Sequence, residues 1–112
     1  MMVELSKSSK KLLSEIDRNI YFENNNFIVI DDCPNYITGN HEILDGNHRA
    51  ANAIQNKKTN ELNIYSIEYA IYKNIINKLN IDNKDFSNQV RFEKLIKRLG
   101  KKINNNEVTL ID

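Results

Sequence analysis

The chain has few of the residues that form cross-links, interrupt helices and strands or anchor a protein at a membrane surface. It contains one cysteine, one proline, three glycines and no tryptophan in 112 residues. The lone Cys33 cannot form an internal disulfide, which favours a reducing, cytoplasmic setting. No apolar run approaches the roughly 20 residues of a membrane-spanning helix, and the first residues lack the apolar core of a signal peptide. One Cys and two His cannot fill a tetrahedral zinc site, and no Gly-rich Walker loop is present. We therefore expect a cytoplasmic protein without membrane contact.

Charge and composition limit the class of protein further. Hydrophobic residues make up 40% of the chain and charged residues 28%, which is typical of one ordinary globular domain. The formal net charge of +1 argues against a broad electrostatic footprint for long nucleic acid, which is therefore not favoured as a partner. The abundance of Asn, Ile and Lys indicates AT-rich coding and a bacterial, plasmid or phage source. A group of cations near the C-terminus is interpreted as solvated helix faces: Lys94, Lys97, Arg98, Lys101 and Lys102.

Apolar spacing predicts helices and short strands in mixed order. Stripes at helical spacing alternate with β-rich runs, and Asn or Gly turns separate them. The predicted strands are a hairpin of 20–22 with 27–30, followed after a loop over 31–40 by strands at 41–44, 62–67 and 108–111. The first predicted helix is capped by Ser8 or Ser9 and reaches Ile20, and two more cover 47–56 and 72–79. The last predicted helix is capped by Asp85 or Ser87 and ends at Leu99, before Gly100. The fold class is thus a small single α+β domain, with a polar joint at 80–84.

The most informative stretch is Asp45-Gly46-Asn47-His48-Arg49, which joins a predicted strand to a predicted helix. The first N–H groups of a helix lack intrahelical partners, and the helix dipole favours an anion there. Gly46 permits a positive φ and a close approach of the backbone to a ligand, and Asn47 adds a backbone donor. His48 and Arg49 add charge-assisted donors, and Asp45 can hold magnesium or take a proton from an attacking hydroxyl. Together these residues predict a seat for a phosphate group.

Each of these residues also has a purely structural interpretation. Asp45 or Asn47 can serve as the helix N-cap, and Gly46 can be a simple turn residue. Arg49 can pair with a nearby acid, and His48 can be a surface side chain. Small residues after the motif keep the helix thin, so that it can pack close to a sheet: Ala50, Ala51 and Ala53.

Outside the motif, His41 can be a general base or merely a residue at the start of a strand. Tyr65, Tyr69 and Tyr72 can stack on a nucleobase, although aromatic residues in a strand and a helix start are more typical of packing.

The run ILDGNHRAANAI, followed by a polar gap and LNIYSIEY, resembles the ParB/sulfiredoxin superfamily, whose members open a helix with a Gly-x-x-Arg type box after a strand. The resemblance covers residues 20–72 and implies a ParB/sulfiredoxin-like core over 1–80, with a C-terminal helical extension over 81–112 packed on the same domain. It implies ATP, ADP or CTP as ligand, with magnesium. The box would bind the nucleotide phosphates through Gly46, Asn47, His48 and Arg49, and Asp45 and His48 would be the catalytic residues.

Departures from the superfamily narrow the implied activity. Asn47 stands where sulfiredoxin has a cysteine, which argues against repair of sulfinic cysteine. His48 replaces the first basic residue of the ParB box, and the downstream polar-Arg motif of ParB has no equivalent. The form is most similar to the branch that phosphorylates free serine. That enzyme also needs an acid from an earlier segment, for which Glu23, Asp31 and Asp32 are candidates.

The run HEILDGNHR also resembles the Fic motif of AMP-transferring enzymes. In that motif the histidine, here His41, is the general base, and the acid, here Asp45, binds magnesium. The chain departs from it at His48, where Fic has glycine, and at Asn52, where Fic has a second arginine. Fic is also an all-helical fold, whereas β-rich runs flank the motif here.

Three hypotheses on function follow. The first is a nucleotide- or phosphate-binding domain of the ParB/sulfiredoxin type, for which a phosphotransferase or NTPase activity through the Asp45–Arg49 turn stays open. The second is a non-catalytic protein-interaction module of a plasmid, phage or defence system. For this module, residues 71–99 would provide an apolar surface patch. The third is a Fic-like AMP transferase.

Overall fold

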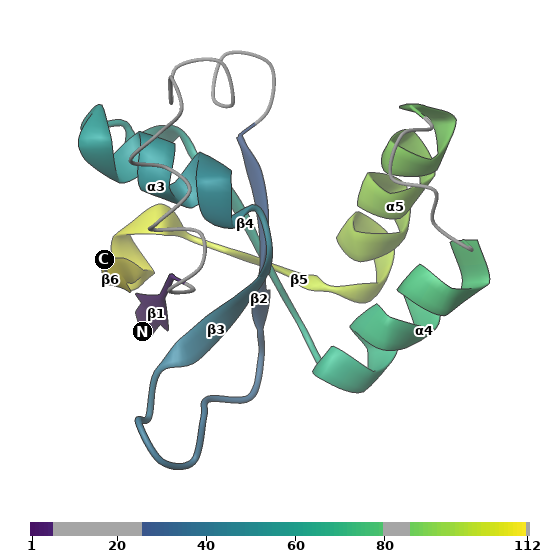
Figure 1. The fold of residues 1–112 in the computed structure, drawn as a ribbon, viewed down its shortest axis with the longest axis horizontal. Coiled ribbons are helices and arrows are strands. Elements are labelled where there is room, and N and C mark those ends of the chain that lie inside the picture. Colours follow the sequence, from purple (N-terminus) through teal and green to yellow (C-terminus); the bar gives the residue numbers. More distant parts are fainter. Residues whose placement is uncertain (6–25, 80–85, 112) are drawn as a thin grey trace.

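The computed structural model describes residues 1–5, 26–79 and 86–111. Figure 1 shows the fold, and the small α+β domain predicted from the sequence is confirmed. The predicted helix ending at Ile20 and the first strand of the predicted hairpin lie outside the described residues. The elements are strands β1 (Met2–Glu4), β2 (Phe27–Asp31), β3 (His41–Asp45), β4 (Asn63–Ile67), β5 (Lys101–Ile103) and β6 (Thr109–Ile111), helices α3 (Asn47–Gln55), α4 (Tyr69–Leu79) and α5 (Phe86–Leu99), and the short 3-10 helices η1 (Thr59–Glu61) and η2 (Asn105–Glu107).

Within these ranges the strands form one mixed sheet in the order β5-β4-β2-β3-β1-β6. β2 and β4 run parallel at the centre, and β3 lies antiparallel beside β2. β1 is parallel to both of its neighbours, β3 and β6. The amide of Thr109 donates to the carbonyl of Met1 (2.8 Å), and the amide of Leu5 donates to that of Ile111 (3.1 Å). Both ends of the described chain therefore lie side by side at one edge of the sheet (Figure 1).

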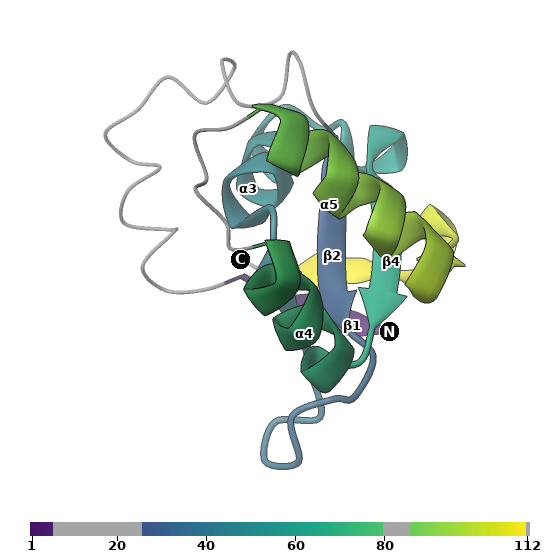
Figure 2. The same cartoon turned by 90° about the vertical axis from the view of Figure 1, so that its right-hand side faces the viewer.

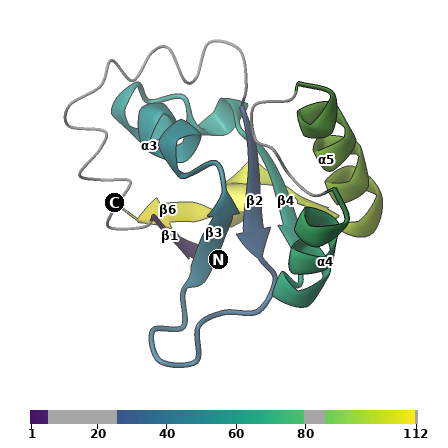
Figure 3. The same cartoon turned by 45° about the vertical axis from the view of Figure 1, so that its right-hand side comes forward.

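The central strand β2 explains why Phe27–Ile30 is a continuous apolar run. Successive side chains of a strand point to opposite faces of the sheet. Ile28 and Ile30 belong to the cluster that includes α3, whereas Phe27 and Val29 belong to the cluster that includes α4 and α5. Figure 3 shows β2 and β4 between α3 on one side and the two later helices on the other. A strand covered on both faces needs apolar residues at every position, and a parallel pair is usually covered in this way.

Helices α4 and α5 pack on the same face of the sheet, in front of β2 and β4 in Figure 2. Their predicted apolar stripes are mostly buried in this packing: Ile75, Leu79, Phe92 and Ile96 are each at most 6% exposed. Of residues 71–99, only Val90 and Leu99 are exposed large hydrophobic side chains within the described residues. Among the described side chains of this stretch, the apolar surface patch that the sequence led us to expect is therefore absent, because one core needs both stripes. No described helix is long and apolar enough to cross a bilayer.

The structure adds two strands that sequence patterns did not predict. β1 pairs with β3 and β6, and β5 pairs antiparallel with β4. Helix α4 also begins at Tyr69, ahead of its predicted start at Tyr72. The C-terminal stretch, expected as a helical extension, therefore contributes β5 and β6 to the sheet in addition to α5.

Candidate functional site

The turn between β3 and α3 is built around Gly46, whose φ of 96° and ψ of 24° lie in the left-handed region. A Cβ at this position would lie 2.7 Å from Cγ2 of Ile28 and 3.0 Å from the carbonyl oxygen of Phe27. Only glycine fits here, because the backbone of the turn is pressed against β2 as well as left-handed. The glycine that the sequence offered as a point of ligand approach therefore also docks the turn on the central strand.

Arg49 folds back over this turn. Its Nη1 donates to the carbonyl oxygen of Phe27 and lies 3.5 Å from Oδ2 of Asp45. The two side chains are only 19% and 32% exposed, and Oδ2 of Asp45 is buried without a hydrogen-bond partner among the described residues. Because burying an uncompensated carboxylate is costly, the guanidinium charge stabilises it. Arg49 is thus the partner of a nearby acid, as its structural interpretation predicts. A guanidinium has five N–H donors, so these contacts leave other donors available.

Tyr72 closes the turn from the other face of the sheet. Its hydroxyl donates to the carbonyl of Leu44 (3.1 Å). Burial, then the charge of Asp45 and then Tyr69, raise the pKa of Tyr72 to about 12. The ring packs edge-on against Phe92, with centroids 6.1 Å apart. Tyr72 is therefore a neutral packing residue that holds the end of β3.

The remaining tyrosines divide between packing and solvent. Tyr65 lies against Phe27, with ring centroids 5.2 Å apart, and is partly buried in the core. Tyr69 is 50% exposed at the start of α4. Of the three tyrosines considered for stacking on a base, only Tyr69 presents a largely accessible ring.

The structure separates His41 from the turn. His41 begins β3, and its Nδ1 lies 2.8 Å from the carbonyl oxygen of Asp31. Asp45 ends the same strand, about 13 Å away at the usual rise of an extended chain. A Fic-like base and acid would sit on a helical fold, but these two residues lie on one strand of a mixed sheet. The fold therefore gives the Fic hypothesis no support.

Asn47 and His48 occupy the first turn of α3 and are both partly exposed. The side-chain amide of Asn47 donates to the carbonyl of Ile43 at 3.5 Å. The small residues that follow are buried as expected, since Ala50 and Ala53 are fully covered. Asn47, His48 and Arg49 are thus brought together at the start of a helix that packs closely on the sheet.

The earlier acids expected for a kinase-like mechanism do not reach this turn. Asp31 and Asp32 lie at the opposite end of β2, where their Oδ1 atoms accept from the amide of Cys33 (3.0 Å) and the hydroxyl of Ser66 (2.8 Å). Glu23 lies outside the described residues. In the part of the chain that the structure describes, no three His, Cys, Asp or Glu side chains gather as metal ligands. Magnesium at Asp45 would therefore depend mainly on oxygens supplied by phosphate and water.

No protein-family model, curated protein or solved structure matches this chain. The chemistry open to the turn follows from its own geometry. It presents a helix N-terminus next to an imidazole and a guanidinium, which suits an oxyanion. No sequence pattern predicts that Phe27 and Tyr72 hold this turn, because their contacts depend on strand register and helix packing.

Proposed function

We propose that the chain binds the phosphate groups of a nucleotide, such as ATP, ADP or CTP, at the β3–α3 turn. The observation that carries this proposal is the start of α3. The helix follows Gly46, a residue with no side chain to cap the first N–H groups, while His48 and Arg49 lie partly exposed in the same turn. A helix N-terminus that follows a glycine and carries two basic side chains attracts a dianionic group.

The residues of the turn then have distinct roles. Backbone donors of Asn47 and the imidazole of His48 contact the phosphate oxygens. Arg49 contributes donors beyond those used on Phe27, and its bond to that carbonyl fixes its direction. Asp45 supplies one carboxylate toward magnesium carried by the phosphates. A phosphotransferase or NTPase activity would act through Asp45 and His48.

A thermal-shift titration with ATP, ADP, CTP and GTP, each with and without magnesium, tests this proposal. Binding to the folded state alone raises stability by RT ln(1 + [L]/Kd), so even weak binding is detectable at high ligand concentration. We expect one nucleotide to give a shift that His48→Ala reduces. Arg49→Ala should weaken binding at least tenfold, about 1.4 kcal/mol.

His41→Ala is the matched control, because it removes an imidazole from the far end of β3 and should leave the nucleotide shift unchanged. The proposal is wrong if no nucleotide stabilises the wild-type chain, or if His48→Ala and His41→Ala give the same shift as the wild type.

A non-catalytic protein-interaction module is the second candidate, and the loop between β2 and β3 favours it. Tyr36 and Ile37 at the tip of this loop are 94% and 76% exposed. Oδ1 of Asn35 accepts from the amides of Ile37 (2.8 Å) and Thr38 (3.2 Å), which holds the tip in one conformation. An aromatic and an aliphatic side chain presented on an ordered loop are suited to anchor an interface.

Co-purification from the cells of origin, followed by binding of the purified partner, tests this second candidate. Tyr36→Ser/Ile37→Ser should abolish the interaction without lowering the melting temperature, since neither side chain is buried. Equal retention of the partner by the wild type and the double variant would contradict it.

A further inference from the structure

The outer surface of α5 and the adjoining β5 carries cations that the fold leaves unpaired. All are exposed, and among the described residues none has a hydrogen bond or an ion pair. The neighbouring Lys97 lies over the ring of Phe27, with Nζ 5.8 Å from the centroid. We call this surface the α5–β5 face, and its unpaired cations are Arg91, Lys94, Arg98 and Lys102.

The cations share one side of the molecule for reasons of spacing and register. Arg91, Lys94 and Arg98 recur at intervals of three and four residues and so lie on one face of the helix. Lys102 pairs with Tyr65 of β4, whose side chain packs in the cluster under α4 and α5. Directly paired residues point to the same side of a sheet, so Lys102 is on the side of α5.

The net charge of the whole chain does not reveal this local excess of positive charge. Residues 91–102 hold six of the 16 Lys and Arg residues and a single acid, Glu93, which accepts from the side-chain amide of Gln89 (3.4 Å). The net charge of +1 therefore averages a strongly basic face with acidic regions elsewhere, such as residues 26–48, which contain Asp and Glu but no Lys or Arg. The overall charge does not exclude an anionic polymer as the partner of this face.

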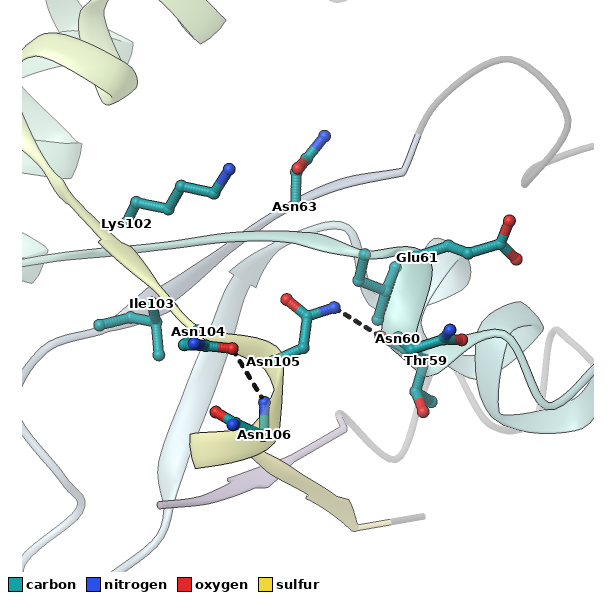
Figure 4. A pocket seen from close by; sticks show the side chains of 10 residues that line it. Thr59, Asn60, Glu61, Asn63, Lys102, Ile103, Asn104, Asn105 and Asn106 are labelled. Carbon is teal, nitrogen blue, oxygen red and sulfur yellow. Dashed lines mark hydrogen bonds between the residues drawn. The ribbon is translucent and has the colours of Figure 1, made fainter.

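A polar hollow of about 860 Å³ begins where the α5–β5 face ends. Figure 4 shows Lys102 and Asn63 rising from β5 and β4 on the same side, with Glu61 directed away from both. The side-chain amide of Asn105 donates to the carbonyl of Thr59 (2.9 Å), which ties η2 to η1 and fixes the walls of the hollow. Its lining is rich in side-chain amides: Asn60, Asn63, Asn104, Asn105 and Asn106.

Two of these side-chain amides do not take part in holding the described fold together. The side chains of Asn60 and Asn106 make no hydrogen bond within the described residues, whereas Oδ1 of Asn104 accepts from the amide of Asn106 (3.4 Å). Each free amide offers one acceptor and two donors. The hollow therefore combines unpaired amides with one unpaired cation, Lys102.

We propose that the α5–β5 face binds a single-stranded nucleic acid, whose phosphates follow the cations and one of whose unstacked bases enters the amide-lined hollow. Lys, Arg and Asn are among the side chains that contact phosphate and sugar oxygens. A side-chain amide matches the adjacent donor and acceptor of an adenine edge. A single strand exposes the base edges that such a hollow can bind, whereas the bases of a duplex are paired with one another. This site is separate from the β3–α3 turn and does not depend on it.

Fluorescence anisotropy of the full chain with a labelled oligo(dA) probe of about 16 nucleotides tests this inference. If all four cations engage phosphates, log Kd should change with log salt with a slope of about 2.8, which weakens binding roughly 50-fold between 50 and 200 mM salt. Lys94→Gln/Arg98→Gln/Lys102→Gln should reduce that slope to about 0.7. The matched control is Lys73→Gln/Lys78→Gln, which removes exposed charges from α4 and should leave the slope unchanged.

The hollow is tested by Asn60→Ala/Asn106→Ala. This variant should lower the affinity for oligo(dA) by about fivefold or more and leave the salt slope unchanged. Oligo(dT), a duplex of the same length and polyglutamate are the comparison probes, and each should bind more weakly than oligo(dA). Absence of binding by the wild type, or equal slopes for the triple variant and the wild type, would overturn the proposal. Polyglutamate binding as tightly as oligo(dA) would overturn it in favour of an acidic protein partner.

Discussion

The β3–α3 turn and the α5–β5 face hold their charges in opposite ways. At the turn, Asp45 and Arg49 lie 3.5 Å apart, and Arg49 also donates to the backbone of β2. On the α5–β5 face, Lys94, Arg98 and Lys102 are exposed and have no partner among the described residues. The conspicuous motif is therefore partly engaged in holding its own turn, whereas the lysines and arginines of the α5–β5 face are not engaged by the described residues. Side chains that a fold leaves unpaired remain fully available to a ligand.

The largest expected effect comes from the glycine that docks the turn. Gly46→Ala should destabilise the protein by about 2–5 kcal/mol, because it adds both a steric overlap and a left-handed non-glycine residue. Gly39→Ala is the control: Gly39 has a φ of +73°, but a Cβ there meets nothing within 4 Å. We expect Gly39→Ala to cost only about 1–2 kcal/mol. Urea unfolding measures both, and equal losses would show that the contact with β2 does not matter.

Identical substitutions of a paired and an unpaired arginine test the comparison most directly. Arg49→Ala should lower the free energy of unfolding by about 1–3 kcal/mol, because the Phe27 carbonyl and the Asp45 carboxylate lose their contacts with the guanidinium. Arg98→Ala should change it by no more than about 0.5 kcal/mol, as expected for a surface side chain without contacts. A similar loss in both variants would mean that the two regions do not differ in this respect.

Tyr72→Phe tests the packing that closes the turn. The loss of the hydrogen bond to Leu44 should cost about 0.5–1.5 kcal/mol at neutral pH. The pKa of Tyr72 is raised to about 12 in the folded state, so the folded protein retains a proton that the unfolded chain releases near pH 10. Its contribution to stability is thus complete below pH 10 and is lost as pH rises from 10 to 12. Melting temperatures across that range should fall less steeply for Tyr72→Phe than for the wild type, and parallel curves would contradict this role.

The smallest expected effect is a gain in stability on the α5–β5 face. Lys94 lies three residues from Arg91 and four from Arg98, so like charges face each other along α5. Lys94→Gln should therefore stabilise the protein by about 0.2–0.5 kcal/mol at low ionic strength, and added salt should remove the difference. Differential scanning calorimetry at two salt concentrations measures it. A loss of stability instead would indicate that Lys94 has an attractive partner in the folded chain.

Much of the fold could be predicted because it rests on local patterns. The apolar run Phe27–Ile30, the stripes of α4 and α5 and the Gly46 turn each identified their element correctly. The missed strands lack such a pattern. β5 has only Ile103 buried, and β1 is a three-residue strand whose partners lie more than 35 residues away. Neither strand has enough residues for an alternating pattern to be recognised, so pairing with distant strands decides their conformation.

The candidate site was less predictable than the fold. The sequence indicated correctly that Asn47, His48 and Arg49 would meet at a helix start, since neighbours in sequence stay neighbours in space. It could not show that Arg49 bonds to Phe27, because that contact depends on how β2 and β3 pair. Nor could it show that Lys102 and Asn63 line one hollow, since β4 and β5 are joined only in the folded sheet. Contacts across the sheet need a register that composition and periodicity do not supply.

The position of β1 has a consequence for the order of folding. The amine of Met1, next to β1, donates to the carbonyl of Glu107 (2.9 Å), a contact between residues separated by 106 positions. Closing so long a loop carries a large entropic cost, and contacts at such separation form slowly. The segment from β2 to β4 contains its own short connections and can assemble while later residues are still being synthesised. β6 is made after α5 and β5, so β1 precedes the other described strands in synthesis and is among the last of them to gain both of its neighbours.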